Sequence, residues 1–186
     1  MTKLSGRKIK IMKNTFNDDL IDYLKKIDNK KIDQIYDKIM SNKKKIIIIG
    51  NGGSASIASH FSIDFNKNFQ KQCLNFSDHS MLTCLANDYG YENWVKEVIK
   101  VHCNEGDILI SISSSGESLN IINGILEAKK KNAFCISLTG FEKDNKVSQI
   151  SDLSFWVNSK SYNVIETIHL IVLLNIIEKF KIKKKY

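Results

Sequence analysis

Two short loops rich in glycine and serine are the segments best suited to chemistry. Gly50-Asn51-Gly52-Gly53-Ser54 and Ser113-Ser114-Ser115-Gly116-Glu117-Ser118 each follow an apolar run and precede a helical pattern. Glycines let backbone N–H groups close around an anion, and a helix N-terminus adds favourable potential for negative charge. The loops therefore predict a phosphate site, whose candidate residues are Asn51, Gly52, Gly53, Ser54, Ser113, Ser114, Ser115 and Ser118.

Neither loop is a nucleotide-binding signature. The first loop lacks the lysine of a P-loop, and its glycine spacing is not that of a dinucleotide fingerprint. Hydroxyl donors instead suit a phosphate monoester on a small molecule. The alternative is that Gly and Ser only form turns and helix caps, as in most strand-to-helix connections. Two such loops at equivalent positions favour the phosphate site.

Carboxylate and imidazole side chains that could transfer protons lie on two of the predicted helices. His60 and Asp64 are four residues apart, so they share one helix face, although Asp64 could also be a surface residue. Glu166 lies on a closing helix that is apolar almost all round, where burial would raise its pKa toward the range of acid–base catalysis. His169, three residues later, is either a further titratable partner or a structural histidine that donates to a backbone carbonyl.

The elements that must position these groups alternate between apolar strands and amphipathic helices. Strands are predicted near residues 46–49, 107–112, 133–138 and 152–157, and their lack of polar alternation indicates burial on both faces. Helices are predicted near residues 11–28, 32–39, 54–65, 118–131 and 162–180. This order predicts an α/β fold with a parallel sheet between helical layers. We expect one domain over residues 11–180 with extra N-terminal helices, a loose arm over 1–10 and a basic tail over 181–186.

Composition restricts the partners and the compartment. Residues 1–45 carry 13 basic and 6 acidic side chains and residues 179–186 carry 5 basic ones, whereas the body of the chain is mildly acidic. A charge surplus confined to the ends argues against a nucleic-acid binder. The four cysteines form no C-x-x-C pair and lie in or beside apolar segments, which indicates reduced thiols and a cytoplasmic protein. No stretch has the length and apolarity of a signal peptide or membrane span.

Five ordered motifs give a more specific indication. Taken together, they resemble the motifs of sugar isomerase (SIS) domain proteins, most closely the phosphoheptose isomerase (sedoheptulose 7-phosphate isomerase) family, over residues 30–180. The motifs are Gly50-Asn51-Gly52-Gly53-Ser54-Ala55, His60-Phe61, Ala86-Asn87-Asp88-Tyr89-Gly90, Ile112-Ser113-Ser114-Ser115-Gly116-Glu117-Ser118 and Leu138-Thr139-Gly140.

The resemblance implies a flavodoxin- or Rossmann-like three-layer αβα sandwich with a five-stranded parallel sheet. It further implies a homotetramer with active sites at subunit interfaces, and a ketose-to-aldose isomerisation that supplies heptose for bacterial surface polysaccharides. By the same resemblance, the serine loop and the Gly-rich loop hold the substrate phosphate, and Asn87 and Asp88 hold sugar hydroxyls or the neighbouring backbone. Some family members also bind zinc in the pocket.

The chain departs from the family at three acid–base positions. The resemblance places Asp64 where the family has Glu, Glu166 where it has Gln, and Leu174 where it has His, while His60 matches. We expect Asp64 to act as the base and Glu166 as its partner acid. Glu166, His169 or a metal then replaces the missing His, and His60, Asp64 and Glu166 are the candidate zinc ligands.

Leu174 also keeps a second function open. Relatives of the replication-initiator-associating type lack the same His, so the chain could be a non-catalytic SIS module that binds a sugar phosphate or a protein partner. A carboxylate on a buried helix, Glu166, favours the enzyme, because a binding module has no need of one.

Overall fold

The computed structural model describes residues 15–69 and 71–185, and the centre of this part of the chain is a parallel sheet. Its order is β2-β1-β3-β4-β5, so the chain leaves β1 toward one side and returns to β3 on the other. β1 and β3 pair in register from Ile46 with Ile108 to Gly50 with Ile112. The two small-residue loops therefore leave the sheet side by side, where ligands of such folds collect. The strands are β1 (Ile46–Gly50), β2 (Cys73–Asn75), β3 (Ile108–Ser113), β4 (Phe134–Thr139) and β5 (Leu153–Trp156).

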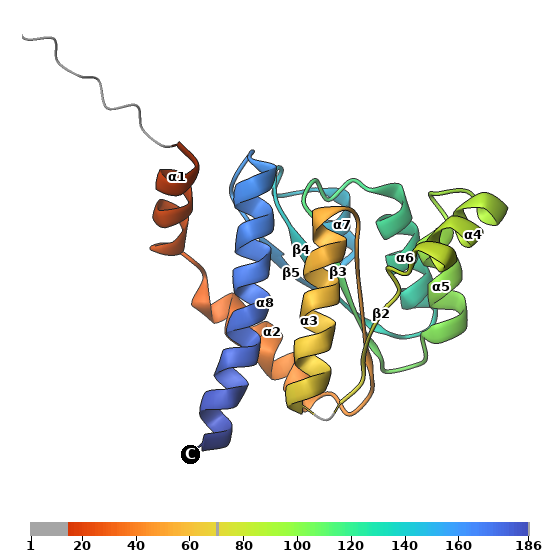
Figure 1. The fold of residues 1–186 in the computed structure, drawn as a ribbon, viewed down its shortest axis with the longest axis horizontal. Helices are drawn as coiled ribbons and strands as arrows, with labels where there is room; N and C mark the ends of the chain where they lie inside the picture. Colours follow the sequence, from red (N-terminus) through yellow and green to blue (C-terminus); the bar gives the residue numbers. More distant parts are fainter. Residues whose placement is uncertain (1–14, 70, 186) are drawn as a thin grey trace, which may run out of the picture.

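Helices cover both faces of the sheet (Figure 1). One layer consists of α2 (Asn29–Ser41), α3 (Gly53–Phe69) and α8 (Tyr162–Lys185). The other consists of α5 (Trp94–His102), α6 (Leu119–Lys130) and α7 (Lys146–Ile150). α1 (Thr15–Leu24) packs beside α8, and α4 (His79–Tyr89) packs on α5. This arrangement confirms the predicted three-layer αβα sandwich.

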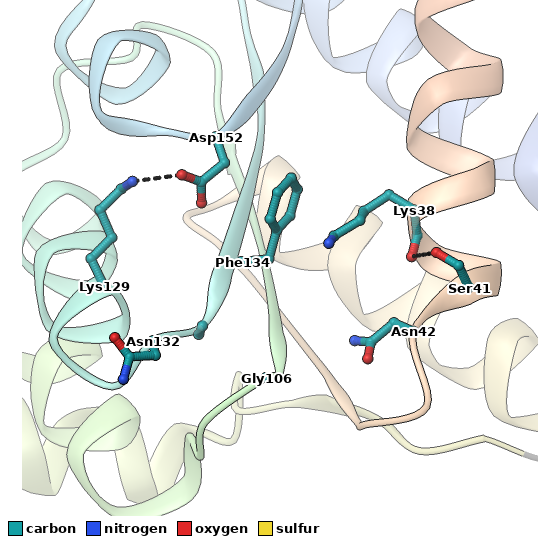
Figure 2. A pocket seen from close by; sticks show the side chains of 9 residues that line it. Lys38, Ser41, Asn42, Gly106, Lys129, Asn132, Phe134 and Asp152 are labelled. Carbon is teal, nitrogen blue, oxygen red and sulfur yellow. Dashed lines mark hydrogen bonds and ion pairs between the residues drawn. The ribbon is translucent and has the colours of Figure 1, made fainter.

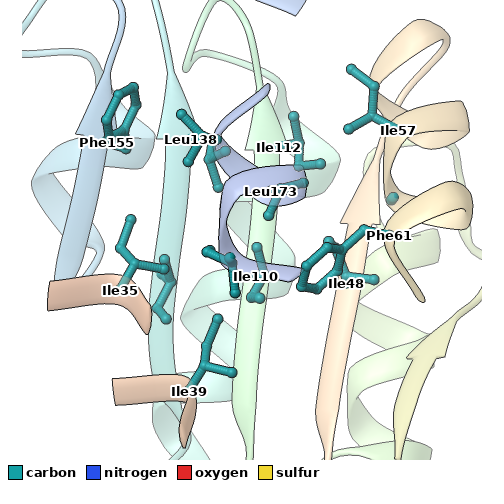
Figure 3. Packing of buried hydrophobic residues seen from close by; sticks show 14 of the residues in the cluster. Ile35, Ile39, Ile48, Ile57, Phe61, Ile110, Ile112, Leu138, Phe155 and Leu173 are labelled. Atoms are coloured by element: carbon teal, nitrogen blue, oxygen red, sulfur yellow. The ribbon is translucent and has the colours of Figure 1, made fainter. Parts of the chain in front are cut away.

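The strand sequences explain this layering. Successive side chains of a strand point to opposite faces, so Ile46 and Ile48 enter the core under α3 and α8. Ile47 and Ile49 enter the core under α5 and α6. Figure 3 shows the first of these cores, where Ile48 lies against Phe61 of α3. A run of four isoleucines thus serves two cores at once, as the missing polar alternation predicts.

The structure differs from the predicted elements near the chain ends and inside the chain, where β2, α4, α5 and α7 form in segments for which no element is predicted. The helix predicted over residues 11–28 ends early: α1 stops at Leu24, and Asp28 already caps α2 by accepting a hydrogen bond from the Lys31 N–H at 3.0 Å. Residues 11–14 and the expected arm over 1–10 lie outside the described residues. α8 continues to Lys185, so residues 181–185, expected as a tail, are helical. No helix among the described residues is long and apolar enough to span a membrane.

Candidate active site

The serine loop forms a tight turn that backbone hydrogen bonds stabilise. The Gly116 N–H donates to the Ser113 carbonyl at 3.0 Å, and the Gly140 N–H, at the end of β4, donates to the Ser114 carbonyl at 2.9 Å. Ser118 is the N-cap of α6, yet its hydroxyl caps no backbone N–H. The hydroxyl of Ser113 lies 3.4 Å from that of Ser118. The Ser115 hydroxyl accepts from the Glu117 N–H at 3.2 Å, so hydrogen bonds within the turn fix its hydroxyls at the N-terminus of α6, while the buried Ser114 hydroxyl has no hydrogen-bond partner among the described residues.

A cavity of about 110 Å³ brings the two loops together with a carboxylate. The loops contribute Asn51, Ser54, Ser113, Ser114, Ser115 and Ser118, and α8 contributes Tyr162 and Glu166. Glu166 reaches the cavity because Gly53 has no side chain: a Cβ at residue 53 would lie 2.9 Å from the Glu166 Cδ. Burial raises the pKa of Glu166 above its ordinary value. The candidate anion loops and a carboxyl group with a raised pKa thus share one space.

A second cavity, of about 370 Å³, lies on the other side of the Gly-rich loop. It is bounded by that loop and by the start of α4, and Asn51 lines both this cavity and the smaller one. Ser59, Ser77, His79 and Tyr91 line it with polar side chains. This cavity is large enough for the hydroxylated part of a ligand whose phosphate occupies the smaller cavity, and these four side chains offer it hydrogen bonds.

Several residues of these cavities were not singled out from the sequence. Tyr162 precedes Glu166 by four residues on one helix, so the i, i+4 spacing could have revealed it. His79 begins α4 and Tyr91 follows that helix, for which no element was predicted, and no signal in the sequence placed the two residues beside the Gly-rich loop.

His60 and Asp64 lie together on α3 but away from Glu166 of the same chain. The His60 Nε2 is 3.4 Å from the Asp64 Oδ2, as the i, i+4 spacing predicts. Asp64 is eleven residues beyond Gly53, a rise of about 16 Å along the helix. Among the described residues, no three His, Cys, Asp or Glu side chains gather as a metal site. His60, Asp64 and Glu166 therefore do not form the expected zinc site within one chain.

His169 is fully buried beneath the end of β4. Its Nε2 is 3.1 Å from the Thr139 carbonyl oxygen, and burial lowers the pKa of the imidazole to about 4. A neutral ring that donates to a backbone carbonyl matches the structural alternative stated above. The residues that line the described cavities do not include His169.

Asn87 and Asp88 lie at the exposed C-terminal end of α4. The Asn87 Nδ2 donates to the Asp88 Oδ1 at 3.1 Å, and the structure does not bring either side chain to the serine loop of the same chain. α4 contributes no buried residue to the fold. A role for Asn87 and Asp88 in holding sugar hydroxyls remains a prediction.

The largest of the described cavities, about 580 Å³, lies at the opposite edge of the sheet (Figure 2). Two of its lysines are already engaged, since Lys129 pairs with Asp152 at 2.8 Å and the Lys38 Nζ lies 3.9 Å from the centre of the Phe134 ring. The C-terminal ends of α2 and α6 line it, and these ends carry negative dipole potential. Its electrostatics suit a phosphate less well than those of the loop cavity.

Replacing Gly116 with Ala should weaken anion binding and destabilise the fold. Gly116 has φ +69°, and a Cβ would lie 2.6 Å from the Asn145 Cβ, so the loop must shift. We expect the free energy of unfolding to fall by about 1–3 kcal/mol and the Kd for inorganic phosphate, measured by calorimetry, to rise at least about tenfold.

Gly106→Ala is the matched control for this substitution. Gly106 has φ +79° but its nearest atom, the Lys44 Cγ, is 3.5 Å from an added Cβ, and the residue lies at the far edge of the sheet. This variant should lose stability and keep its phosphate affinity. Equal affinities in both variants would argue against the loop as the anion site.

Comparisons with known proteins identify the family of this chain. Residues 15–140 match the family model of the SIS domain. The chain is 34% identical over 156 residues to a phosphoheptose isomerase of Fusobacterium nucleatum, covering 81% of this chain and 80% of that protein. It is 36% identical over 182 residues to a phosphoheptose isomerase of Buchnera aphidicola, covering 91% and 90%.

Solved structures show the same fold. A phosphoheptose isomerase from Francisella tularensis superposes with a TM-score of 0.82 at 24% identity, covering 90% of this chain and 95% of the other. One from Neisseria gonorrhoeae gives 0.79 at 24% identity, covering 89% and 91%. The SIS domain match and the identity of 34–36% over most of the chain together show that this chain belongs to the phosphoheptose isomerase family of SIS domain proteins.

Proposed function

We propose that this chain isomerises sedoheptulose 7-phosphate to D-glycero-D-manno-heptose 7-phosphate in the synthesis of heptose for bacterial surface polysaccharides. The observation that carries the proposal is the cavity in which the phosphate loops meet the carboxylate of Glu166. The names of the relatives at 34–36% identity support the substrate. The four cysteines, which are all free thiols, support a cytoplasmic location.

The reaction moves a carbonyl from C2 to C1 through an enediol. A base removes a proton from C1, the electron pair of that C–H bond forms the C1–C2 double bond, and the C2 oxygen takes a proton from an acid. Return of a proton to C2 and loss of one from the C1 hydroxyl then give the aldose, with no net change in protons. Glu166 suits the acid, because its raised pKa keeps the proton on the carboxyl closer to neutral pH.

Asp64 suits the base only if a second copy of the chain supplies it. The rise of about 16 Å along α3 separates it from the Glu166 of its own chain. The same face of α3 is open to contact: Ile63 is 63% exposed and the His60 side chain is 51% exposed. We infer a homotetramer in which this face of one copy covers the cavity of another. An interface of this kind would also unite His60, Asp64 and Glu166 as zinc ligands, although no step above depends on a metal.

Turnover of sedoheptulose 7-phosphate by the wild-type chain, followed by proton NMR in D₂O, is the first test. The aldose anomeric proton should appear, and deuterium should enter C2. Asp64→Asn and Glu166→Gln should each be nearly inactive. Co-expression of the two variants should restore activity toward about a quarter of the wild-type value, because a two-fold interface then assembles some sites with both native carboxylates.

Three outcomes separate the possibilities. No rescue on mixing, with both variants inactive, would mean that one copy supplies both groups or that one of them has another role. Full activity in either single variant would remove that carboxylate from the mechanism. Tight binding of the sugar phosphate without any turnover would instead support a binding module, the alternative left open by Leu174.

A further inference from the structure

The side-chain amides of Asn51 and Asn120 join the two phosphate loops directly. The Asn51 Nδ2 donates to the Asn120 Oδ1 at 3.0 Å, and the Asn120 Nδ2 donates to the Asn51 Oδ1 at 2.8 Å. Asn51 follows β1, and Asn120 lies in the first turn of α6. Asn120 is only 2% exposed, so its amide is committed to this pair. The pair therefore ties together the loops of two neighbouring strands.

A third hydrogen bond determines which hydrogen-bonding groups of the Asn51 side chain remain free. The Tyr91 hydroxyl donates to the Asn51 Oδ1 at 3.2 Å, so this oxygen already accepts two hydrogen bonds. A carbonyl oxygen has two lone pairs, and an amide nitrogen has two N–H groups, of which Asn120 uses one. The remaining group on the Asn51 side chain is one N–H donor.

The position of Asn51 indicates which ligand atoms this donor can meet. Asn51 lines both the loop cavity of about 110 Å³ and the cavity of about 370 Å³ beside it. In sedoheptulose 7-phosphate the phosphate and the reacting C1–C2 end are at opposite ends of a seven-carbon chain. With the phosphate in the smaller cavity, a donor at the boundary faces oxygens of the sugar chain.

We propose that Asn120 and Tyr91 are positioning residues that fix the Asn51 amide as an N–H donor toward a sugar oxygen. This inference rests on the proposed isomerase function and deepens it. A donor held in place before the substrate binds fixes the course of the sugar chain, and with it the position of the reacting end relative to the acid and the base. Loss of either positioning residue should therefore reduce the rate of the chemical step and leave the phosphate site intact.

Asn120→Ala is the main test, with Asn123→Ala as its matched control. Asn123 is the same residue type one turn later on α6, and its Nδ2 donates to the Glu92 carbonyl at 2.8 Å. We expect kcat with sedoheptulose 7-phosphate to fall about 10- to 100-fold in Asn120→Ala, while the Ki of inorganic phosphate changes less than about twofold. The Asn123→Ala variant should keep both values.

Two further variants keep the test informative if Asn120→Ala folds poorly. Tyr91 is 52% exposed, so Tyr91→Phe should fold normally and lower kcat by about 2- to 10-fold. In Asn120→Asp, an ionised carboxylate cannot donate to the Asn51 Oδ1, but a protonated one can. The kcat of this variant relative to wild type should therefore recover as the pH falls, which a purely structural role of Asn120 would not produce.

Calorimetry separates this proposal from the proposed function, because it requires no turnover. If the wild-type chain does not isomerise sedoheptulose 7-phosphate, the isomerase proposal fails. The positioning role then predicts that Asn120→Ala weakens binding of the sugar phosphate and leaves that of inorganic phosphate unchanged. Equal loss of affinity for both ligands, or an unchanged kcat in Asn120→Ala and Tyr91→Phe, would overturn the inference.

Discussion

Glu166→Gln should lower kcat for sedoheptulose 7-phosphate by about 10²- to 10⁴-fold, the range of a lost general acid. Gln keeps the shape of the side chain and its place against Gly53, but it cannot release a proton to the substrate oxygen. KM should change little, because the phosphate contacts of the serine loop remain. Steady-state kinetics of Glu166→Gln, with Glu178→Gln as its matched control, would check this prediction.

Glu178→Gln is the control member of this pair. Glu178 lies on the same helix, α8, where it pairs with Lys181 at 2.6 Å on the exposed surface. Its replacement should leave kcat within about twofold of wild type, since an exposed ion pair of this kind contributes little. A similar loss of activity in both variants would indicate that α8 has been perturbed rather than that a proton donor has been removed.

Wild type and Glu166→Gln should differ in the pH dependence of two quantities, kcat and the free energy of unfolding. Burial raises the pKa of Glu166, and the carboxyl must be protonated to act as an acid, so the wild-type kcat should fall as the pH rises through that pKa. The Gln variant should lack this alkaline limb. Because the folded pKa is raised, the stability that Glu166 contributes is fully present below its unfolded pKa and is lost as the pH rises through the folded value.

The Gln variant should consequently be more stable than wild type at neutral pH. This advantage in Tm should shrink as the pH falls toward the ordinary range of a glutamate, about 4.3. Thermal unfolding at a series of pH values measures the difference. An advantage that grows on acidification would mean that the folded protein stabilises the ionised carboxylate, contrary to the pKa shift.

Gly53→Ala should lower kcat about a hundredfold while the fold remains stable, because a displacement of about 1 Å at a reacting group can have that effect. Residue 53 begins α3, where Ala is the better helix former. The added Cβ would nevertheless occupy the space of the Glu166 carboxylate, whose side chain can swing away. We therefore expect kcat to fall while Tm stays the same or rises.

A double variant tests whether Gly53 acts through Glu166. If the methyl group only displaces the carboxylate, Gly53→Ala combined with Glu166→Gln should be no less active than Glu166→Gln alone. Multiplied losses in the double variant would indicate that Gly53 also serves the anion site directly, for example through its backbone N–H.

The strands that cross the core could be predicted from the sequence, and the reason is physical. β1 and β3 consist of apolar runs such as Ile46–Ile49, buried on both faces, so local composition and final environment agree. β2 could not be recognised, because three residues, Cys73–Asn75, are too short for a pattern. α4 was not predicted because it is short and its apolar residues, Met81, Leu82 and Leu85, give only a brief helical period and are only partly buried against the core.

The candidate site likewise contains features that the local sequence predicts and others that it does not. The two loops could be found because glycine and serine report on backbone conformation and hydrogen bonding within a few residues. The contact of Glu166 with Gly53 joins positions more than a hundred residues apart, and only the packing of α3 on α8 creates it. The sequence pairs Asp64 and Glu166 as base and acid, but their separation within one chain depends on the same packing and could not be predicted.

Because α4 has no fully buried side chain, the two ends of the candidate ligand site should differ in how well they tolerate substitutions. The phosphate end is built from the tips of β1 and β3, where most substitutions would disturb a core. The wall contributed by α4 touches the larger cavity through His79 and Leu82, while none of its side chains is fully buried. A substitution at an exposed position of α4, such as His79, can therefore alter this wall of the cavity at little cost in stability and leave the phosphate end unchanged.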